Sequence, residues 1–97
     1  MSKFNDIINS EVPTLVDFSA TWCGPCKMME PILQNLSKKV GNSARILKVD
    51  IDKNPAVANL YQIQSVPTLL LFVKGEIKWW QSGVVNEQHL AEIISKF

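Results

Sequence analysis

Hydrophobic residues recur along this chain with two spacings, one typical of buried strands and the other of helices. Residues 14–19, TLVDFS, are apolar on both faces except for Asp17, which indicates a strand in the middle of a covered sheet. From residue 23 the spacing becomes that of a helix with one buried face, formed by Met29, Ile32, Leu33, Leu36 and Val40. Gly41 is the predicted stop of this helix, and Pro31 inside it predicts a kink.

The rest of the chain predicts shorter elements. Residues 45–51 are a predicted strand, and Asn54 and Pro55 are the predicted N-cap and first position of a helix to residue 61. Residues 68–73 and 76–82 are predicted antiparallel strands around a turn at Gly75. Asn86 caps a last predicted helix, whose inner face holds Leu90, Ile93, Ile94 and Phe97. Residues 4–10 favour one further short helix.

The order of these elements predicts an α/β fold. A strand, a helix and a second strand in succession indicate a parallel pair joined by a crossover. The hairpin adds antiparallel strands, so the central sheet is expected to be mixed. The chain has 97 residues, of which 46% are hydrophobic, and no linker or repeat divides it. We therefore expect a single domain over residues 1–97.

Charge and hydropathy narrow the range of partners. Ten basic and nine acidic residues leave a net charge of +1 without any block of like charges, which argues against nucleic acid and anionic membranes. The first residues contain no apolar segment of signal-peptide length, and the longest apolar run, residues 69–73, is too short to cross a bilayer. A soluble, cytoplasmic protein is expected.

The two cysteines, Cys23 and Cys26, could form a static disulfide, hold half of a metal site, or act as a reversible redox pair. A cytosolic location disfavours the static disulfide. Structural zinc needs four ligands, and the other candidate, His89, is on the last predicted helix, where we expect it in solvent. The spacing therefore favours redox chemistry, with no metal bound.

The positions of the two cysteines predict different roles. Cys23 follows a buried strand and opens a helix, where free N–H groups and the helix dipole stabilise a thiolate. Cys26 lies nearly one turn further on, within reach of Cys23, and is expected to be the less accessible. Exposed Cys23 would attack a client disulfide and sheltered Cys26 would resolve the mixed disulfide. Gly24 admits a partner chain, and Pro25 fixes the turn.

Asp17 is the only acidic residue inside an apolar strand, and burial is expected to raise the pKa of its carboxyl. A proton acceptor of this kind would serve Cys26 when Cys26 attacks. Lys48, on the neighbouring predicted strand, could lie on the same face and offset the burial. The simpler alternative is a buried charge that Lys48 neutralises, without any part in proton transfer.

Two pairs of large side chains have structural explanations. Of Met28 and Met29, at least one is expected in the core at helical spacing. Trp79 and Trp80 are adjacent on a strand and must point to opposite faces, so one is expected under the last helix and the other partly exposed. A partner-binding patch is the alternative for the exposed tryptophan.

The motif WCGPC, residues 22–26, comes after VDF with Asp17 and before Lys27 and Pro31. It resembles the active site of the thioredoxin family, and SVPTLLLF with Pro67 resembles that family's cis-proline segment. The resemblance runs from about residue 13 to the end of the chain, and includes the KGE turn and Gly83.

The resemblance implies a thioredoxin fold, with a mixed four-stranded sheet flanked by about four helices. The family usually begins with a further strand and a longer helix, whereas only twelve residues precede Pro13 here. We therefore expect the first strand to be absent or vestigial. Residues 45–51 would then form an exposed sheet edge, open to chain pairing or local instability.

The resemblance also assigns roles to residues of this chain. Cys23 would be the attacking thiol and Cys26 the resolving thiol. Asp17 would be the buried proton acceptor and Lys48 its partner. A cis proline at position 67 would leave the backbone of the preceding valine free to pair with an extended substrate. The substrate groove would consist of Trp22, Gly24, Pro25, Val66, Pro67, Gly83 and Val84.

The function implied is that of a cytosolic thiol-disulfide oxidoreductase of thioredoxin type, reducing protein disulfides as an electron donor in redox homeostasis. No cofactor would be bound, since NADPH acts indirectly through thioredoxin reductase. Disulfide-containing client proteins would be the other partners, and a monomer is expected. A binding module that grips one dedicated partner and a specialised oxidising member are the alternatives. The Gly-Pro pair between the cysteines resembles that of reducing members.

Overall fold

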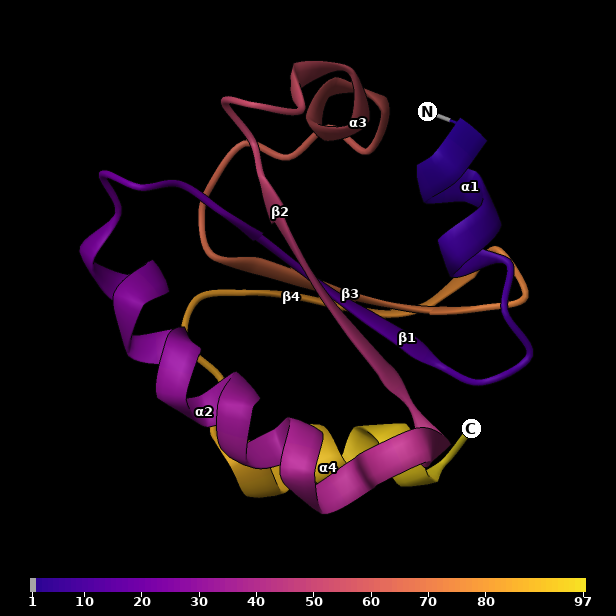
Figure 1. The fold of residues 1–97 in the computed structure, drawn as a ribbon. Coiled ribbons are helices and arrows are strands. Elements are labelled where there is room, and N and C mark those ends of the chain that lie inside the picture. Colours follow the sequence, from indigo (N-terminus) through magenta and orange to yellow (C-terminus); the bar gives the residue numbers. More distant parts are fainter. Residues whose placement is uncertain (1) are drawn as a thin grey trace.

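A computed structural model of the protein describes residues 2–97 (Figure 1). Helices and strands follow one another in the order that the hydrophobic spacing predicts. The elements are α1 (Ser2–Ile8), β1 (Thr14–Ser19), α2 (Gly24–Val40), the 3-10 turn η1 (Gly41–Ser43), β2 (Arg45–Asp50), α3 (Pro55–Leu60), β3 (Thr68–Val73), β4 (Glu76–Ser82) and α4 (Glu87–Ser95). The predicted bounds of β1, β3 and β4 are confirmed.

The four strands form one mixed sheet in the order β2-β1-β3-β4. β1 runs parallel to β2, with Asp17 opposite Lys48, whereas the pairs β1–β3 and β3–β4 are antiparallel. The predicted fold class is confirmed. β2 has a neighbour on one side only, so the expected exposed sheet edge is present among the described residues.

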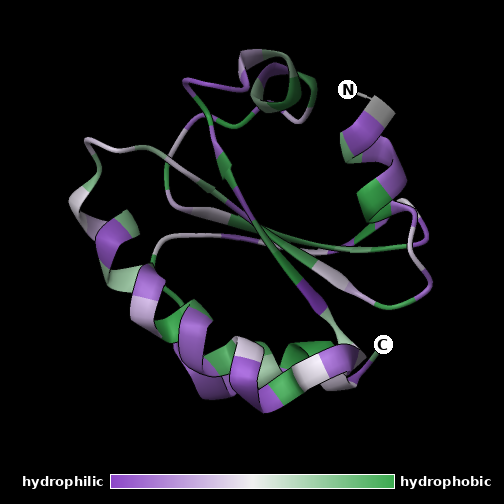
Figure 2. Ribbon diagram, viewed as in Figure 1, coloured by the Kyte–Doolittle hydropathy of each residue, from purple (hydrophilic) through white to green (hydrophobic). Residues whose placement is uncertain are grey.

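Helices cover both faces of the sheet, with α2 and α4 on one face and α1 and α3 on the other (Figure 1). Side chains of β1 alternate between the two resulting cores: Leu15 belongs to the α2 and α4 core, and Val16 and Phe18 belong to the α1 and α3 core. Figure 2 shows hydrophobic residues along the central strands and polar residues on the outer surface of α2. Alternation places Asp17 beneath α2, on the same face as Leu15.

One predicted detail at a helix end is wrong. Phe97 is not on an inner helix face, because α4 ends at Ser95 and the Phe97 side chain lies beyond its last turn, 52% exposed. Asn54 is the N-cap residue of α3 and Pro55 its first residue, as predicted, although the Asn54 side chain accepts no capping hydrogen bond and donates to the Asp50 carbonyl at 3.1 Å. α2 is one helix with Pro31 inside it, and its predicted stop is confirmed, because it ends at Val40 with Gly41 as the C-cap residue at a φ of +54°.

None of the helices among residues 2–97 combines the length and the apolar character needed to cross a membrane.

Candidate active site

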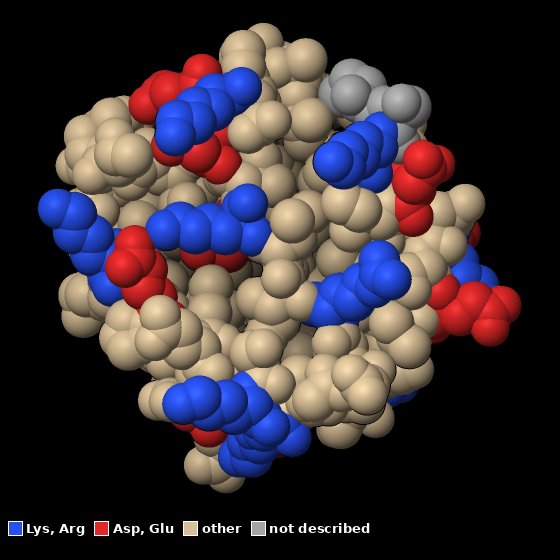
Figure 3. All heavy atoms as spheres, in the orientation of Figure 1, with Lys and Arg blue, Asp and Glu red and all other residues tan. Residues whose placement is uncertain are grey.

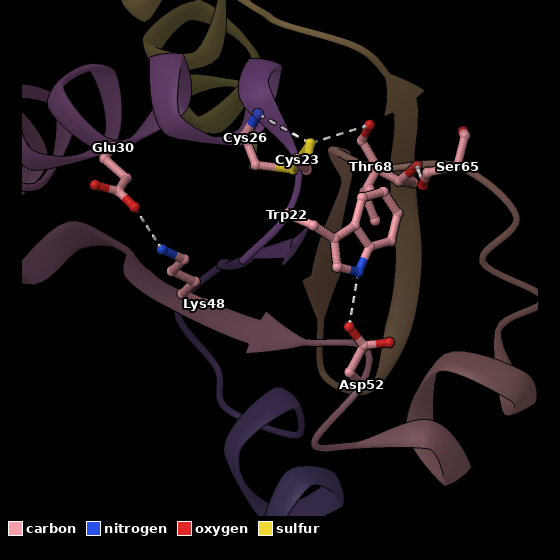
Figure 4. Close-up of a disulfide and its surroundings, with 9 residues drawn as sticks. Trp22, Cys23, Cys26, Glu30, Lys48, Asp52, Ser65 and Thr68 are labelled. Carbon is pink, nitrogen blue, oxygen red and sulfur yellow. Dashed lines mark hydrogen bonds and ion pairs between the residues drawn. A yellow bond between two sulfur atoms is a disulfide. The ribbon is translucent and has the colours of Figure 1, made fainter. Parts of the chain in front are cut away.

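Cys23 and Cys26 form a disulfide at the start of α2, with their Cα atoms 5.3 Å apart (Figure 4). Cys23 is the N-cap of the helix, in an extended conformation, and its Sγ accepts a hydrogen bond from the Cys26 backbone N–H at 3.1 Å. This N–H group and the helix dipole favour negative charge on the Cys23 sulfur when the pair is reduced. The first helical turn therefore activates one of the two sulfurs.

Both cysteines are buried in the disulfide form, with Cys23 4% and Cys26 2% exposed. The expectation that Cys23 would be the exposed member is wrong for this state. The sulfurs share a small apolar cluster with Ala20, against which Ile51 and Val66 pack. Gly24 and Pro25, between the cysteines, are exposed, which leaves this side of the motif open to a partner chain.

The loop before β3 lies against the cysteine pair. The Val66–Pro67 peptide bond is cis, as the resemblance implied, and the Val66 carbonyl oxygen lies 3.6 Å from Cys23 Sγ. The Gly83 backbone N–H donates to the Pro67 carbonyl at 2.8 Å, which ties the segment after β4 to this loop. Gly83 has a φ of +92°, a conformation that favours glycine. Exposed Val84 follows it directly.

Asp17 is fully buried beneath α2, and among residues 2–97 no donor reaches either of its carboxylate oxygens. Burial raises the pKa of Asp17 from 3.8 to about 6, an effect that nearby Lys48 opposes and Glu30 reinforces. The predicted direction of this pKa shift is confirmed. A carboxyl with this pKa can exchange a proton close to neutral pH.

Lys48 does not form an ion pair with Asp17, although the two residues are register neighbours. Its Nζ donates to Glu30 Oε1 at 2.9 Å, and both side chains are about half exposed (Figure 4). That hydrogen bond lowers the pKa of Glu30. The expectation that Lys48 offsets the burial of Asp17 is confirmed, since its charge lowers the pKa of Asp17, but it does so without a direct ion pair. The lysine keeps its ammonium group hydrated by reaching outward to α2.

A hollow of about 270 Å³ separates α2 from the ends of β1 and β2. Both the resolving cysteine and the Lys48–Glu30 pair border it, and its lining residues are Ser19, Ala20, Thr21, Cys26, Lys27, Glu30, Lys48 and Asp50. Figure 3 shows basic and acidic side chains interspersed over the face of the molecule that it draws. The lining of the hollow likewise holds two basic and two acidic residues, Lys27, Lys48, Glu30 and Asp50, so it has no single charge.

A family model described as Thioredoxin matches residues 1–96. This chain belongs to the thioredoxin family. It is accordingly a thiol-disulfide oxidoreductase, and Cys23 and Cys26 fit the family's redox-active pair.

Thioredoxins of two bacteria are similar over nearly their whole length. The chain is 46% identical to thioredoxin of Staphylococcus saprophyticus over 95 residues, which is 98% of this chain and 90% of the relative. It is 40% identical to thioredoxin of Rickettsia typhi over 92 residues, covering 95% of this chain and 88% of the relative.

Two solved structures share the fold. A mutant thioredoxin from Halobacterium salinarum NRC-1 has a TM-score of 0.90 and is 35% identical in sequence. The match covers 100% of this chain and 84% of the Halobacterium chain. The second is a chain from a structure that concerns thiol resolution in yeast mitochondrial 1-Cys peroxiredoxin via glutathione/thioredoxin systems. It has a TM-score of 0.88 and is 31% identical, and the match covers 100% of this chain and 90% of that one.

Trp22 has a partner that sequence reasoning missed. Its indole Nε1 donates to Asp52 Oδ2 at 2.9 Å, while the side chain remains 68% exposed beside the thioredoxin motif (Figure 4). Asp52 follows β2, thirty residues further along, and no local pattern connects the two residues. The bond holds the indole in place next to the cysteine pair.

Glu30 was also missed, although one signal was available. It follows Cys26 by four residues, and residues with this spacing lie on the same face of a helix. Glu30 is therefore expected on the same side of α2 as Cys26, and both residues line the hollow.

The remaining predictions concern residues outside the site. Among residues 2–97, no group of three or more His, Cys, Asp or Glu side chains could hold a metal ion. His89 is exposed, and its ring stacks edge-on against Trp79 at 6.2 Å. Trp79 packs on the α2 and α4 core and Trp80 is half exposed, as predicted. Met29 is the buried member of its pair.

Proposed function

We propose that this thiol-disulfide oxidoreductase is a protein-disulfide reductase, which donates electrons to client proteins in the cytoplasm. The observation that carries the proposal is the Cys23–Cys26 disulfide at the start of α2, beside the cis Val66–Pro67 bond. The Gly-Pro pair between the cysteines resembles that of reducing members. A reductase also needs a compartment that keeps thiols reduced, and the cytoplasm is one.

Cys23 begins the reaction in the reduced protein. Its thiolate attacks one sulfur of a client disulfide, so a Cys23–client bond forms and the client's S–S bond breaks. The electron pair of the broken bond stays on the second client sulfur, which takes a proton from solvent. The Cys26 N–H, which contacts Cys23 Sγ at 3.1 Å, supports the attacking thiolate.

Cys26 completes the reaction. Its thiol gives a proton to the Asp17 carboxylate, and the resulting thiolate attacks Cys23 Sγ. The Cys23–Cys26 bond forms, the Cys23–client bond breaks, and the electron pair leaves on the client sulfur. The client has gained two electrons, and the two cysteines have lost them. The buried position of Asp17 and its pKa of about 6 support this role.

The client is expected to bind as an extended strand over the loop before β3. Val66 lies next to Cys23 and precedes a proline that has no N–H, so the Val66 backbone can pair with such a strand. Trp22 and Val84 offer exposed apolar surface on either side, and Gly24, Pro25, Pro67 and Gly83 complete the proposed groove.

Thioredoxin reductase is the proposed source of electrons, and it draws on NADPH. The chain itself needs no bound cofactor, because the two sulfurs store both electrons between one reaction and the next. We further propose that it acts as a monomer, since the reaction uses residues of one chain only.

Insulin reduction tests the proposal. Wild-type protein with NADPH and a thioredoxin reductase should reduce insulin disulfides over many turnovers, followed as NADPH oxidation at 340 nm. The Cys26→Ser variant should lose turnover and accumulate an insulin chain linked to Cys23, visible by mass spectrometry. The Cys23→Ser/Cys26→Ser variant is the control for noncovalent retention. No turnover by folded wild-type protein, or no trapped adduct, would rule the proposal out.

A further inference from the structure

The ion pair between Lys48 and Glu30 lies at the hollow beside buried Asp17. It joins β2 to α2 through Nζ and Oε1, 2.9 Å apart. Cys26 borders the same hollow, one helical turn before Glu30. The pair therefore shares a hollow with the proton donor of the proposed resolving step, and both of its charges act on the proposed acceptor, Asp17.

Lys48 is the cation best placed to reach Asp17. The two residues are directly opposite each other on parallel strands, and both project from the α2 face of the sheet. Yet neither carboxylate oxygen of Asp17 has a hydrogen-bond donor among the described residues, whereas Glu30 holds the ammonium group. A carboxylate on α2 thus competes with Asp17 for the same cation.

Few other charges face this region. From α2, Lys27 lines the hollow together with Glu30; from β2, Asp50 lines it together with Lys48. β3, which pairs with β1 on its other side and places Leu69 opposite Asp17, has no charged residue. The distribution of charge around Asp17 therefore depends chiefly on where the Lys48 side chain rests.

We infer that Glu30 is a positioning residue for the resolving half-reaction, because it holds the Lys48 ammonium group at the outer side of the hollow and away from Asp17. The inference rests on the proposed function in one respect, namely that Asp17 accepts the proton of Cys26 in the resolving step. Glu30 touches neither the reacting sulfurs nor, in the proposed mechanism, the client.

The chemical consequence concerns the strength of Asp17 as a base. An ammonium group in contact with a carboxylate lowers its pKa by about 1–3, which would leave Asp17 too weak a base to take a proton from a thiol. With Lys48 held by Glu30, the pKa of Asp17 remains at about 6. The carboxyl can then accept the Cys26 proton and release it again near neutral pH.

Replacing Glu30 by glutamine tests the inference, since the amide keeps the shape of the side chain and removes its charge. The Asp17 carboxyl is titrated by ¹³C NMR in the oxidised protein, where neither cysteine titrates. In Glu30→Gln the pKa of Asp17 should fall by about 1, because Lys48 is released toward it. The matched control is Glu76→Gln, which breaks an exposed Lys78–Glu76 pair of 3.1 Å on β4. The control should leave the titration unchanged.

A double variant separates positioning from simple charge repulsion. In a Lys48→Gln background, Glu30→Gln should lower the pKa of Asp17 by less than half as much as in wild type, because no ammonium group remains to be released. An equal effect in both backgrounds, or none in either, would overturn the inference.

The resolving rate provides the kinetic test. Release of a client thiol from the Cys23 mixed disulfide should show an apparent pKa that falls in Glu30→Gln together with that of Asp17 and is unchanged in Glu76→Gln. A rate profile that does not move would overturn the inference. The NMR titration needs no client and therefore tests the positioning of Lys48 independently of the insulin assay. Wild-type protein that fails to reduce insulin would refute the proposed function, and the titration would still decide the inference.

Discussion

Asp17 differs from the other acidic residues of the chain in being fully buried without a hydrogen-bond donor among the described residues. Burial raises the pKa of this carboxyl from 3.8 to about 6. Well below pH 3.8 the group is neutral in both the folded and the unfolded chain. Between pH 4 and pH 6 it ionises first in the unfolded chain, so the folded state becomes less stable as the pH rises through this range.

Asp17→Asn should therefore stabilise the protein above pH 6 and slow its resolving step. The amide cannot ionise, so the variant avoids a cost of about 2–3 kcal/mol at pH 7, whereas the same cost should be well under about 1 kcal/mol at pH 4. Urea unfolding at both pH values measures the difference.

The exposed residue Asp6 offers a control for this comparison, since Asp6→Asn removes a carboxylate that has no burial cost. Its stability relative to wild type should be nearly independent of pH. An Asp17→Asn variant that is equally stable relative to wild type at pH 4 and pH 7 would contradict the raised pKa.

At the scale of elements, α4 and α3 both have an asparagine as N-cap residue, but only one of these side chains forms a capping hydrogen bond. Asn86 is extended, and its Oδ1 accepts the His89 N–H at 2.8 Å. Asn54 has a ψ of 58°, and its side chain accepts no hydrogen bond from the first turn of α3. The backbone conformation before the helix, and not the residue type, decides whether the cap forms.

Asn86→Ala should consequently destabilise the protein by about 1 kcal/mol, the usual value of a lost N-cap. The matched change Asn54→Ala should cost less, because it removes no capping hydrogen bond. Urea unfolding of both variants gives the comparison. If both variants lost the same free energy of unfolding, the capping hydrogen bond of Asn86 would contribute nothing measurable to stability.

At the scale of the whole molecule, the sheet has two unequal edges and two central strands. β2 bonds to β1 on one side, with the Arg45 N–H donating to the Pro13 carbonyl at 2.8 Å and the Ile51 N–H donating to the Ser19 carbonyl at 2.9 Å. Because successive N–H groups point in opposite directions, those of Leu47 and Val49 also face β1. Those of Ile46 and Lys48 face the free edge.

Hydrogen exchange should reveal this alternation. In the monomer, the amides of Ile46 and Lys48 should exchange at least about tenfold faster than those of Leu47 and Val49, since they need no opening of the sheet. Amide exchange followed by NMR provides the rates, and each outward amide has an inward neighbour as its control. Equal protection of both sets would show that the edge is covered, and sedimentation would then identify a second copy.

Sequence spacing alone predicted the strands with the strongest burial patterns and the helix that follows the motif. The runs at β1, β3 and β4 are bounded by turn residues, and α2 has a regular apolar face with Gly41 at its end. Local preferences act within a few residues, so they determine where such elements begin and end. The family motif added the cis bond before Pro67 and the proximity of this loop to the cysteines.

The tertiary structure decided which distant side chains meet. The Lys48–Glu30 pair joins residues 18 apart, and the Trp22–Asp52 bond joins residues 30 apart. Long polar side chains can reach several partners from one backbone position, and only the packing of α2 over the sheet selects among them. The same packing buries both cysteines. The sequence alone therefore determined the redox pair and its buried carboxyl, while the folded chain determined the charges that surround them.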